Sequence, residues 1–307
     1  MQPKIKYMKK IILLFTSLSL IGFQVTGQDY AFKVLANKGG NEIKVSDGWQ
    51  PIKTGASLTS NDEIKIGPNA YLALVHNNGM PKELKAPGNY LVKNLSKELE
   101  SGEGGSVLNK YTDFILSSNT AEGKKNRLTA TGAVHRGDSK FAINVLLPRP
   151  MEAPEIFSNK VILKWESNEV KGPYILSFKD DFLEEFFSVE TTETEYDLDL
   201  SIKNLANHPN FSIFISSKND PSQTSNQYLI KKMNTKDVEA ITTDLHEVQA
   251  NLERESALTQ YILAVFFEEK GLTIDALTAF EEAVRLAPDV PTYQESLEEF
   301  LLRHELK

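Results

Sequence analysis

Short runs of alternating apolar and polar residues fill the first part of the chain. "NEIKVS", "DEIKIG" and "AYLALVH" alternate in this way, and "NYLVKNL" is a further apolar run. The runs are separated by turn-forming pairs such as Asp47-Gly48 and Asn78-Gly79. Alternation with a period of two is typical of half-buried strands, and these pairs supply the backbone angles of tight turns. The pattern predicts a small all-β sandwich or barrel, each of these runs being a strand.

A helical period follows within the same region. "SVLNKYTDFILSS", residues 106–118, places Leu108, Tyr111 and Ile115 on one face. We expect this helix to pack back onto the β domain, because a free helix of this length is marginal in water. The first folded unit then covers residues 28–119. Residues 120–145 contain few large apolar side chains and are interpreted as a linker.

Alternation returns in residues 146–233. Val161, Leu163 and Trp165 share one strand face, and several further runs such as "NFSIFISS" have strand character. About seven short strands in a region of this size predict a sandwich of the immunoglobulin or fibronectin type.

The period changes to that of a helix from residue 234 to the end of the chain. "NTKDVEAITTDLHEVQANL" carries an apolar stripe, and three further helical segments follow. The expected fold is therefore mainly β in the N-terminal two-thirds, with two small β-sandwich-like domains, and all-α over residues 234–307, with a helical-repeat character.

The N-terminus has the pattern of an export leader. A basic head is followed by "IILLFTSLSLIGF", which has no charge, and then by small residues. This order is that of a secretory signal peptide, and we place it at residues 1–27. The chain has no cysteine, so the thiol of a lipoprotein is missing. No later segment is long and apolar enough to span a membrane. We therefore expect a periplasmic or secreted protein without a membrane span in the mature chain.

The charge narrows the choice of partners. The chain has 34 basic and 42 acidic residues, a net charge of −8. Removal of the leader with its four lysines would leave 30 basic residues and a net charge of −12. A chain this acidic repels phosphate backbones, so we expect no nucleic-acid partner.

The stretch "GWQPIKTGASLTSNDEIKIGPNAYLALVHNNG", residues 48–79, followed by "KELKAPGNYLV", resembles the FecR-type periplasmic domain. The matching positions are Gly48, Ile52, Gly55, Leu58, Asp62, Ile64, Gly67, Ala70, Leu72, Leu74 and Gly79. The resemblance implies a β-rich exported module that contacts other proteins, and it implies no catalysis. Regulators of that family carry a cytoplasmic segment and a membrane helix before the β domain. Here a signal peptide stands in that place, so their anti-sigma mechanism is not transferred. Ig-like domains often follow such modules, as residues 146–233 would.

Residues 257–289 resemble one tetratricopeptide repeat. The matching positions are Leu263, Ala264, Phe267, Gly271, Ala276, Phe280, Ala283 and Pro288. Such repeats need about three units to be stable alone, so we expect a four-helix cap that leans on the Ig-like domain or on a second copy of the chain. One interpretation is a groove for a partner's peptide, lined by Tyr261, Val265 and Glu268. The other is a structural or dimerising bundle.

No reactive constellation stands out. The five histidines occur in no zinc-binding spacing, and the chain contains neither a nucleophile elbow nor a phosphate-binding loop. We therefore expect no enzyme, and no catalytic, cofactor-binding or metal-binding residues. The acidic run at residues 180–185 leaves a calcium site or a solvated acidic face open.

These features together predict an exported, non-enzymatic envelope protein that acts as a protein–protein interaction or scaffold module. Its expected partners are envelope proteins, with a homodimer through the helical C-terminus as a further possibility. The alternative is a carbohydrate- or peptidoglycan-binding module, for which Trp49 beside the Asp47-Gly48 turn is the candidate contact.

Overall fold

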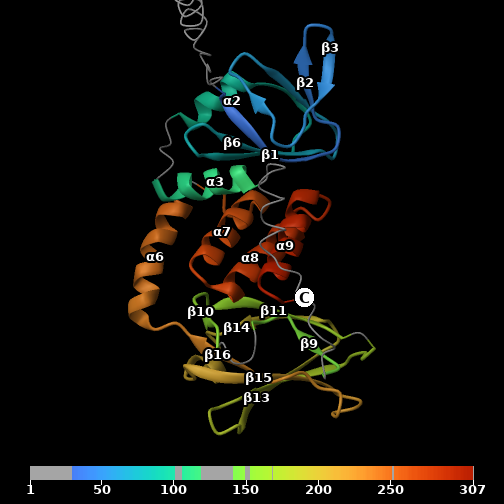
Figure 1. The fold of residues 1–307 in the computed structure, drawn as a ribbon, viewed down its shortest axis with the longest axis vertical. Coiled ribbons are helices and arrows are strands. Elements are labelled where there is room, and N and C mark those ends of the chain that lie inside the picture. Colours follow the sequence, from blue (N-terminus) through green and yellow to red (C-terminus); the bar gives the residue numbers. More distant parts are fainter. Residues whose placement is uncertain are drawn as a thin grey trace, which may run out of the picture.

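A computed structural model describes residues 30–100, 106–118, 141–148, 153–167, 169–250 and 252–306. The expected signal peptide and most of the expected linker lie outside these ranges. A layer of helices lies between a β domain at one end of the molecule and a second β domain at the other (Figure 1). The predicted fold class is thus confirmed: the sheets fall within residues 32–232, and the C-terminal region is helical over residues 235–303.

Two antiparallel sheets form the first β domain. One sheet has the order β4-β1-β6-β7 and the other has the order β3-β2-β5-β8. The strands are β1 (Phe32–Lys38), β2 (Glu42–Val45), β3 (Gly48–Pro51), β4 (Ser57–Leu58), β5 (Glu63–Ile66), β6 (Tyr71–His76), β7 (Pro81–Leu84) and β8 (Gly88–Leu91).

The composition of the run "NYLVKNL" suggested a single strand, but the structure divides this run between a strand and a helix. β8 ends at Leu91, and helix α2 (Val92–Leu99) begins at the next residue. Val92 and Leu95 are spaced by three residues and both are buried against the sheets. This spacing fits a helix face, whereas a strand would turn one of the two side chains to water.

A β-bulge in β1 lets this strand serve two cores. Its pairing with β6 shifts register between Val34 and Ala36. Val34 faces the core between the two sheets, whereas Leu35 and Ala36 both belong to the cluster shared with the helices. An extra residue in a strand re-aims the side chains beside it, and here β1 gains two successive buried contacts with the helices.

The helices are α3 (Ser106–Ser118), α6 (Thr235–Gln249), α7 (Ala257–Glu269), α8 (Thr273–Leu286) and α9 (Pro291–Arg303). Asn234 and Ser256 cap the first turns of α6 and α7 by accepting hydrogen bonds from backbone N–H groups. Gly271, with φ of 75°, makes the tight turn between α7 and α8. Pro291 begins α9 at a position where its missing N–H costs nothing.

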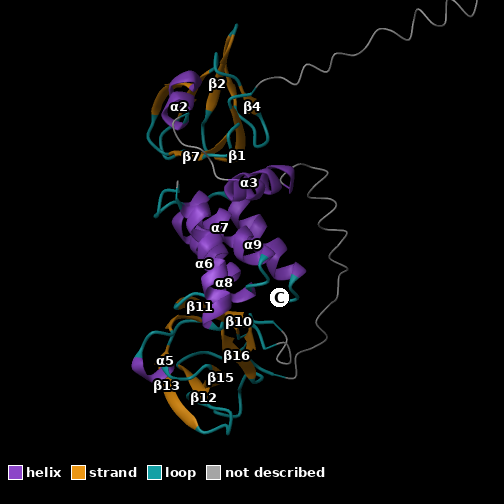
Figure 2. Ribbon diagram, turned by 90° about the vertical axis from the view of Figure 1, so that its left-hand side faces the viewer, coloured by secondary structure: helices purple, strands orange, loops and turns teal. Residues whose placement is uncertain are grey.

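Helix α3 lies between the first β domain and the other helices (Figure 2). Leu108, Tyr111 and Ile115 are buried in one apolar cluster with residues of α7, α8, α9, β1 and β6. The first β domain and the helices therefore share a single core, as expected for a repeat pair that cannot bury its apolar faces alone.

A polar contact also joins the first β domain to the helices. The Glu83 carboxylate accepts hydrogen bonds from the Tyr71 hydroxyl at 2.5 Å and from the Leu258 N–H, at the start of α7, at 2.7 Å. The Tyr71 hydroxyl uses its single proton in the hydrogen bond to Glu83. The Tyr293 hydroxyl of α9 is therefore the donor in the 2.6 Å contact between the two hydroxyls. Burial raises the pKa of both tyrosines, so both stay protonated.

The second β domain consists of a five-stranded sheet, β10-β16-β15-β12-β13, and a three-stranded sheet, β14-β11-β9. Its strands are β9 (Asn144–Val145), β10 (Glu155–Ile156), β11 (Lys160–Glu166), β12 (Tyr174–Lys179), β13 (Glu185–Thr191), β14 (Glu195–Asp199), β15 (Asn210–Ser217) and β16 (Tyr228–Lys232), with a short helix α5 (Lys203–Ala206) before β15. Residues 143–145, in the range interpreted as a linker, belong to this domain: Ile143 and Val145 are fully buried in its core.

Helix α8 covers one edge of β11. The Asp275 carboxylate accepts hydrogen bonds from the N–H groups of Phe157 and Ser158 at 3.1 and 2.7 Å. The Thr278 hydroxyl accepts one from the Ile162 N–H at 2.9 Å. Helix α8 thereby satisfies backbone groups that an exposed strand edge would offer to another chain.

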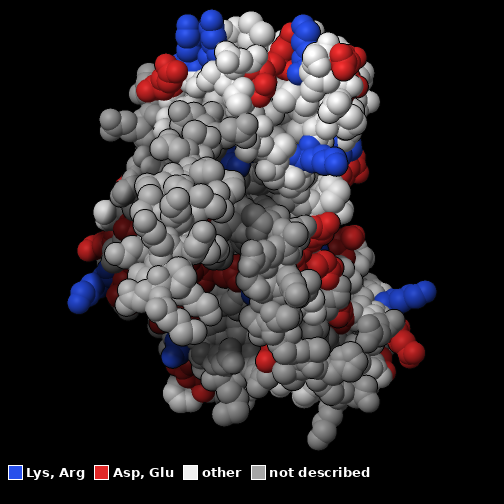
Figure 3. Space-filling view, turned by 45° about the horizontal axis from the view of Figure 1, so that its top comes forward, with Lys and Arg blue, Asp and Glu red and all other residues white. Residues whose placement is uncertain are grey.

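None of the helices in the described ranges has both the length and the apolar character that a membrane crossing requires. On the face drawn in Figure 3, acidic and basic side chains are interspersed over the first β domain and form no single basic patch.

Candidate functional site

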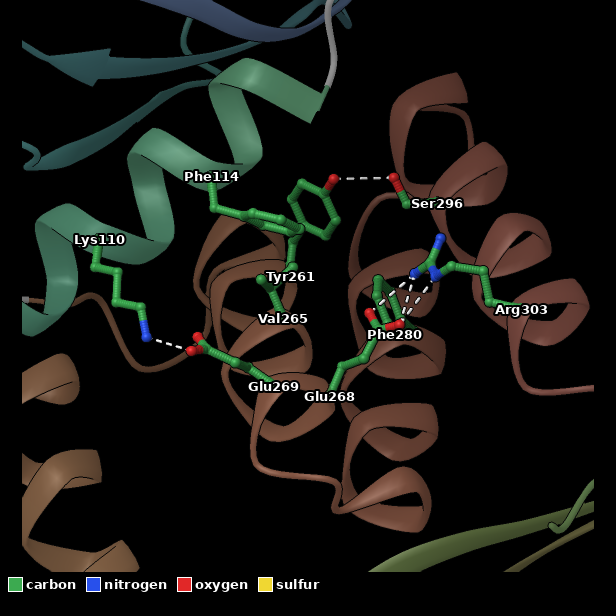
Figure 4. Close-up of a pocket in the computed structure, with 9 residues that line it drawn as sticks. All are labelled: Lys110, Phe114, Tyr261, Val265, Glu268, Glu269, Phe280, Ser296 and Arg303. Carbon is green, nitrogen blue, oxygen red and sulfur yellow. Dashed lines mark hydrogen bonds and ion pairs between the residues drawn. The ribbon is translucent and has the colours of Figure 1, made fainter. Parts of the chain in front are cut away.

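A cavity of about 490 Å³ lies between α3, α7, α8 and α9. Its lining comes from every one of these helices and consists of Lys110, Phe114, Tyr261, Val265, Glu268, Glu269, Phe280, Ser296 and Arg303 (Figure 4). We call it the helical pocket. A concave site of this size with an apolar lining and few polar groups is the usual form of a binding site.

Apolar side chains form the floor of the helical pocket. Tyr261 and Val265 stand one turn apart on α7, and Phe280 comes from α8. All three are at most 7% exposed. The Ser296 hydroxyl of α9 donates a hydrogen bond of 3.0 Å to the Tyr261 hydroxyl, which fixes the ring against the wall. The floor is thus apolar, and its one phenol is hydrogen-bonded to a neighbouring helix.

Phe114 of α3 forms part of the rim. Its side chain points from α3 toward Tyr261 (Figure 4), yet the residue is 53% exposed. Beside it, the Lys110 ammonium is paired with the Glu269 carboxylate of α7. An exposed phenyl ring at the mouth of an apolar cavity offers a contact surface for an incoming group.

Glu268 is held in the opposite wall. Its carboxylate accepts three hydrogen bonds from the Arg303 guanidinium, at 2.8 to 3.0 Å, and one of 2.9 Å from Nε2 of His304. Burial raises the pKa of Glu268, but the His304 hydrogen bond and the Arg303 charge outweigh burial and hold the pKa below its usual range. Glu268 therefore stays ionised near neutral pH.

The rim carboxylates are poorly suited to acid–base catalysis. A general acid or base needs a pKa near the working pH and a position within reach of the substrate proton. Glu268 has a lowered pKa and is clamped by Arg303, and Glu269 is paired with Lys110. What the arrangement can do is accept an apolar group on its floor between two neutralised ion pairs.

The structure brings together three of the four residues expected to contact a partner. Tyr261, Val265 and Glu268 recur on α7 at the spacing of one helix face and line the same pocket. Tyr261 and Val265 are buried in the floor, so an incoming group would meet them only inside the cavity.

Trp49 lies elsewhere, in the β2–β3 hairpin of the first β domain. It is only half-buried, and the Lys44 and Lys65 ammonium groups lie 5.9 and 5.7 Å from its ring centroid. These two lysines also pair with Glu63 and Glu42. The tryptophan is thus packed into a ladder of charged side chains on the solvent face of a sheet.

Sequence reasoning missed the contributions of α3 and α9. Lys110, Phe114, Ser296 and Arg303 are pocket residues that no motif singled out. One signal was present: Phe114 continues the apolar stripe of residues 106–118 but lies at its margin. No sequence motif indicates that α3 packs against α7, and the pocket depends on this packing.

The acidic run at residues 180–185 lies in the turn between β12 and β13 and reaches the first residue of β13. Within the described residues, no three His, Asp or Glu side chains form a group that could hold a metal. Asp180 uses one carboxylate oxygen to accept hydrogen bonds from the N–H groups of Phe182 and Glu184, both at 2.9 Å. This carboxylate therefore shapes a turn.

The fold and the site define a chain in which helices that line an apolar pocket join two β domains. No model of a known protein family matches the sequence. No curated protein matches it either.

Proposed function

We propose that this chain is an exported, non-enzymatic envelope protein that binds a protein partner through the helical pocket and serves as a scaffold. The observation that carries the proposal is the pocket itself, a cavity of about 490 Å³ with a buried aromatic floor and a rim whose charges are already paired. Such a site favours an uncharged apolar side chain and selects against a free charge, since a charge would lose its hydration without gaining a partner.

The expected occupant is a large apolar side chain on a partner segment. Burial of about 120 Å² of apolar surface would contribute roughly 3 kcal/mol, at about 25 cal/mol per Å². Phe114 at the rim adds an aromatic contact of the kind that dominates binding hot spots. The floor side chains are buried before binding and Tyr261 is already hydrogen-bonded, so little of their freedom remains to be lost when a partner binds.

The scaffold part of the proposal rests on the position of the helices. They contact both β domains, so a partner held in the pocket has a fixed place relative to both ends of the chain. The resemblances to a FecR-type module and to a tetratricopeptide repeat agree with a role in protein contacts. Export to the periplasm or beyond is proposed from the leader at residues 1–27.

Cross-linking in cells that produce the full chain tests the proposed pocket. Val265→Trp would fill the cavity and Phe114→Ser would remove the rim contact. We expect both changes to abolish the cross-links to discrete envelope proteins. Leu302→Ser is the matched control, because Leu302 is similarly exposed at 48% and does not line the pocket. Cross-links that survive both pocket changes would rule out the pocket as the partner site.

Two further measurements separate the parts of the proposal. N-terminal sequencing of the mature protein should find cleavage after Gly27, and an intact leader on cytoplasmic protein would contradict export. Light scattering of the purified chain gives its mass in solution. A dimer that Val265→Trp dissociates would make a second copy of the chain, and not another envelope protein, the occupant of the pocket.

A further inference from the structure

The turn between β12 and β13 presents two large apolar side chains to solvent. Phe182 is 87% exposed, the highest value among the large apolar residues of the described chain, and its neighbour Leu183 is 50% exposed. We call these two residues the apolar tip. Exposed apolar residues scattered singly need no explanation, but an adjacent pair at the end of a hairpin is a contact surface of the kind that mediates association.

The apolar tip is held in place and is far from the helical pocket. The hairpin below it is closed by a hydrogen bond of 3.0 Å from the Asp180 N–H to the Glu184 carbonyl, and Phe178 and Phe187 pack with ring centroids 5.2 Å apart in its stem. Figure 1 places β13 at the end of the molecule remote from the first β domain. A pre-formed tip loses little conformational entropy when it inserts into a partner.

Four acidic residues flank the apolar tip in the sequence. They are Asp180, Asp181, Glu184 and Glu185. Within the described part of the chain, none of these four forms an ion pair with a lysine or arginine. Asp180 accepts two backbone hydrogen bonds within the turn, so the carboxylates of Asp181, Glu184 and Glu185 are the ones available to a partner, unlike the charges at the rim of the helical pocket.

We propose that the apolar tip is a second docking surface, which inserts into an apolar pocket rimmed by Lys and Arg on another protein. The chemistry of the tip selects this occupant. Carboxylates that flank two apolar side chains repel the anionic surface of a membrane, and they gain most where a desolvated pocket presents cations. The chain's own pocket is a poor match, because its cations, Lys110 and Arg303, are already bound to Glu269 and Glu268.

A photo-cross-linker at the tip provides the direct test. The probe is p-benzoylphenylalanine in place of Phe182 in the full chain, activated in intact cells. We expect one discrete adduct whose cross-linked peptide carries apolar residues flanked by Lys or Arg. The same probe in place of Leu302 controls for nonspecific capture at an exposed apolar position. An adduct on an apolar site without basic neighbours would overturn the proposal, as would an adduct equally strong from position 302.

Charge reversal tests whether the carboxylates matter. The double variant Asp181→Lys and Glu184→Lys should lower the adduct yield roughly tenfold, since close charge pairs at an interface contribute about 1.5 kcal/mol or more. The control is Asp47→Lys with Glu193→Lys, which changes the net charge equally at exposed positions away from the tip. An unchanged yield in the first variant would refute the predicted basic rim.

Two other occupants give distinct results. Sedimentation of the chain with vesicles of phosphatidylcholine, alone or with phosphatidylglycerol, that is lost in Phe182→Ser would make the tip a membrane contact and overturn the proposal. An adduct whose cross-linked peptide comes from a second copy of the chain would also overturn it. Since Phe182 is exposed, Phe182→Ser should leave the melting temperature unchanged, which separates a lost contact from a lost fold. Neither result bears on the helical pocket, which the variants at Val265 and Phe114 test separately.

Discussion

The two β domains contact the helical layer through different proportions of apolar and polar interactions. At the first joint, Leu35, Ala73 and Val75 of the β domain lie in the same apolar cluster as the helices and are at most 1% exposed. At the second joint, Ile274 of α8 enters the core of the β domain, Leu146 lies in the cluster of the helices, and the rings of Phe157 and Phe267 are 6.0 Å apart between centroids. This joint adds polar contacts made by Asp275 and Thr278 and an ion pair of 2.8 Å between Lys164 and Glu281.

This difference determines how each joint responds to conditions. An apolar core holds in proportion to its buried area and contains no group that titrates near neutral pH. A polar joint depends on geometry and on protonation, because its groups need their partners to offset the cost of burial. We therefore expect the first β domain and the helices to unfold as one unit, and the second β domain to be separable from them.

The largest effect is expected from a cavity in the core that the first β domain shares with the helices. Leu35→Ala should lower the free energy of unfolding by about 2–5 kcal/mol, because the side chain is fully buried and leaves a cavity. Hydrogen exchange should then rise in β1 and in α7 and α9 together. Leu74→Ala is equally buried, but in the core between the two sheets, and should raise exchange in the helices as well if the β domain and the helices unfold as one unit. Helices that stay protected in Leu35→Ala would contradict a single unit.

A smaller effect is expected at the polar joint. Asp275→Asn keeps the shape but turns one of the two acceptor oxygens into a donor, which then faces a backbone N–H. We expect a loss of about 1–3 kcal/mol, the cost of a buried group without its hydrogen bond, and faster exchange at the Phe157 and Ser158 amides. Asp220→Asn, on an exposed turn of the same domain, should leave those amides unchanged. If exchange rises equally in α7, the joint is not separate.

A titration sharpens the comparison further. Burial raises the pKa of Asp275 above its unfolded value, so its contribution to stability is full at acid pH and is lost as the pH rises through the folded pKa. The lowered pKa of Glu268 has the opposite sign: its contribution is present above the unfolded value and is lost as the pH falls through the folded pKa.

Two variants test the opposite pKa shifts of Asp275 and Glu268. Urea unfolding from pH 3.5 to 7 should give a penalty for Asp275→Asn that shrinks as the pH rises, and a penalty for Glu268→Gln that grows. Parallel curves for the two variants would disprove the assignment of opposite pKa shifts.

The smallest effect is expected far from both joints. Trp49→Ala removes a half-buried ring whose contacts are Lys44 and Lys65, and cation–π contacts at exposed sites contribute about 0.5–1 kcal/mol. Neither joint should change its exchange rates. The variant also tests the alternative function: a loss of sedimentation with cell-wall material would favour carbohydrate binding, and unchanged sedimentation would remove Trp49 as its contact.

Periodicity predicted the fold class because each part of the chain buries its apolar residues with one clear period. It failed locally at "NYLVKNL", where Val92 and Leu95 follow a helical spacing that starts inside a strand-like run. Residues 143–145 were also hard to place from sequence, because the strand containing them, β9, is only two residues long.

The candidate site was only partly visible in the sequence. The face of α7 that carries Tyr261, Val265 and Glu268 follows from helical spacing. Its covering by Phe114 and Lys110 depends on a contact between residues about 150 positions apart, and no local pattern encodes such a contact. The bulge at Leu35 could not be predicted either, because the sequence pattern of β1 does not reveal which of its residues is the extra one.

The shared core between β1, β6 and the helices also limits how such a chain can change over generations. In an open solenoid each unit contacts only its neighbours, so copies can be added at an end. Here the helix that follows the pair, α9, packs on the bulged strand β1, and α8 is bonded to β11. Duplication of the helical pair would have to disrupt one of these two contacts. This architecture therefore favours substitutions on its surfaces over the addition of further repeats.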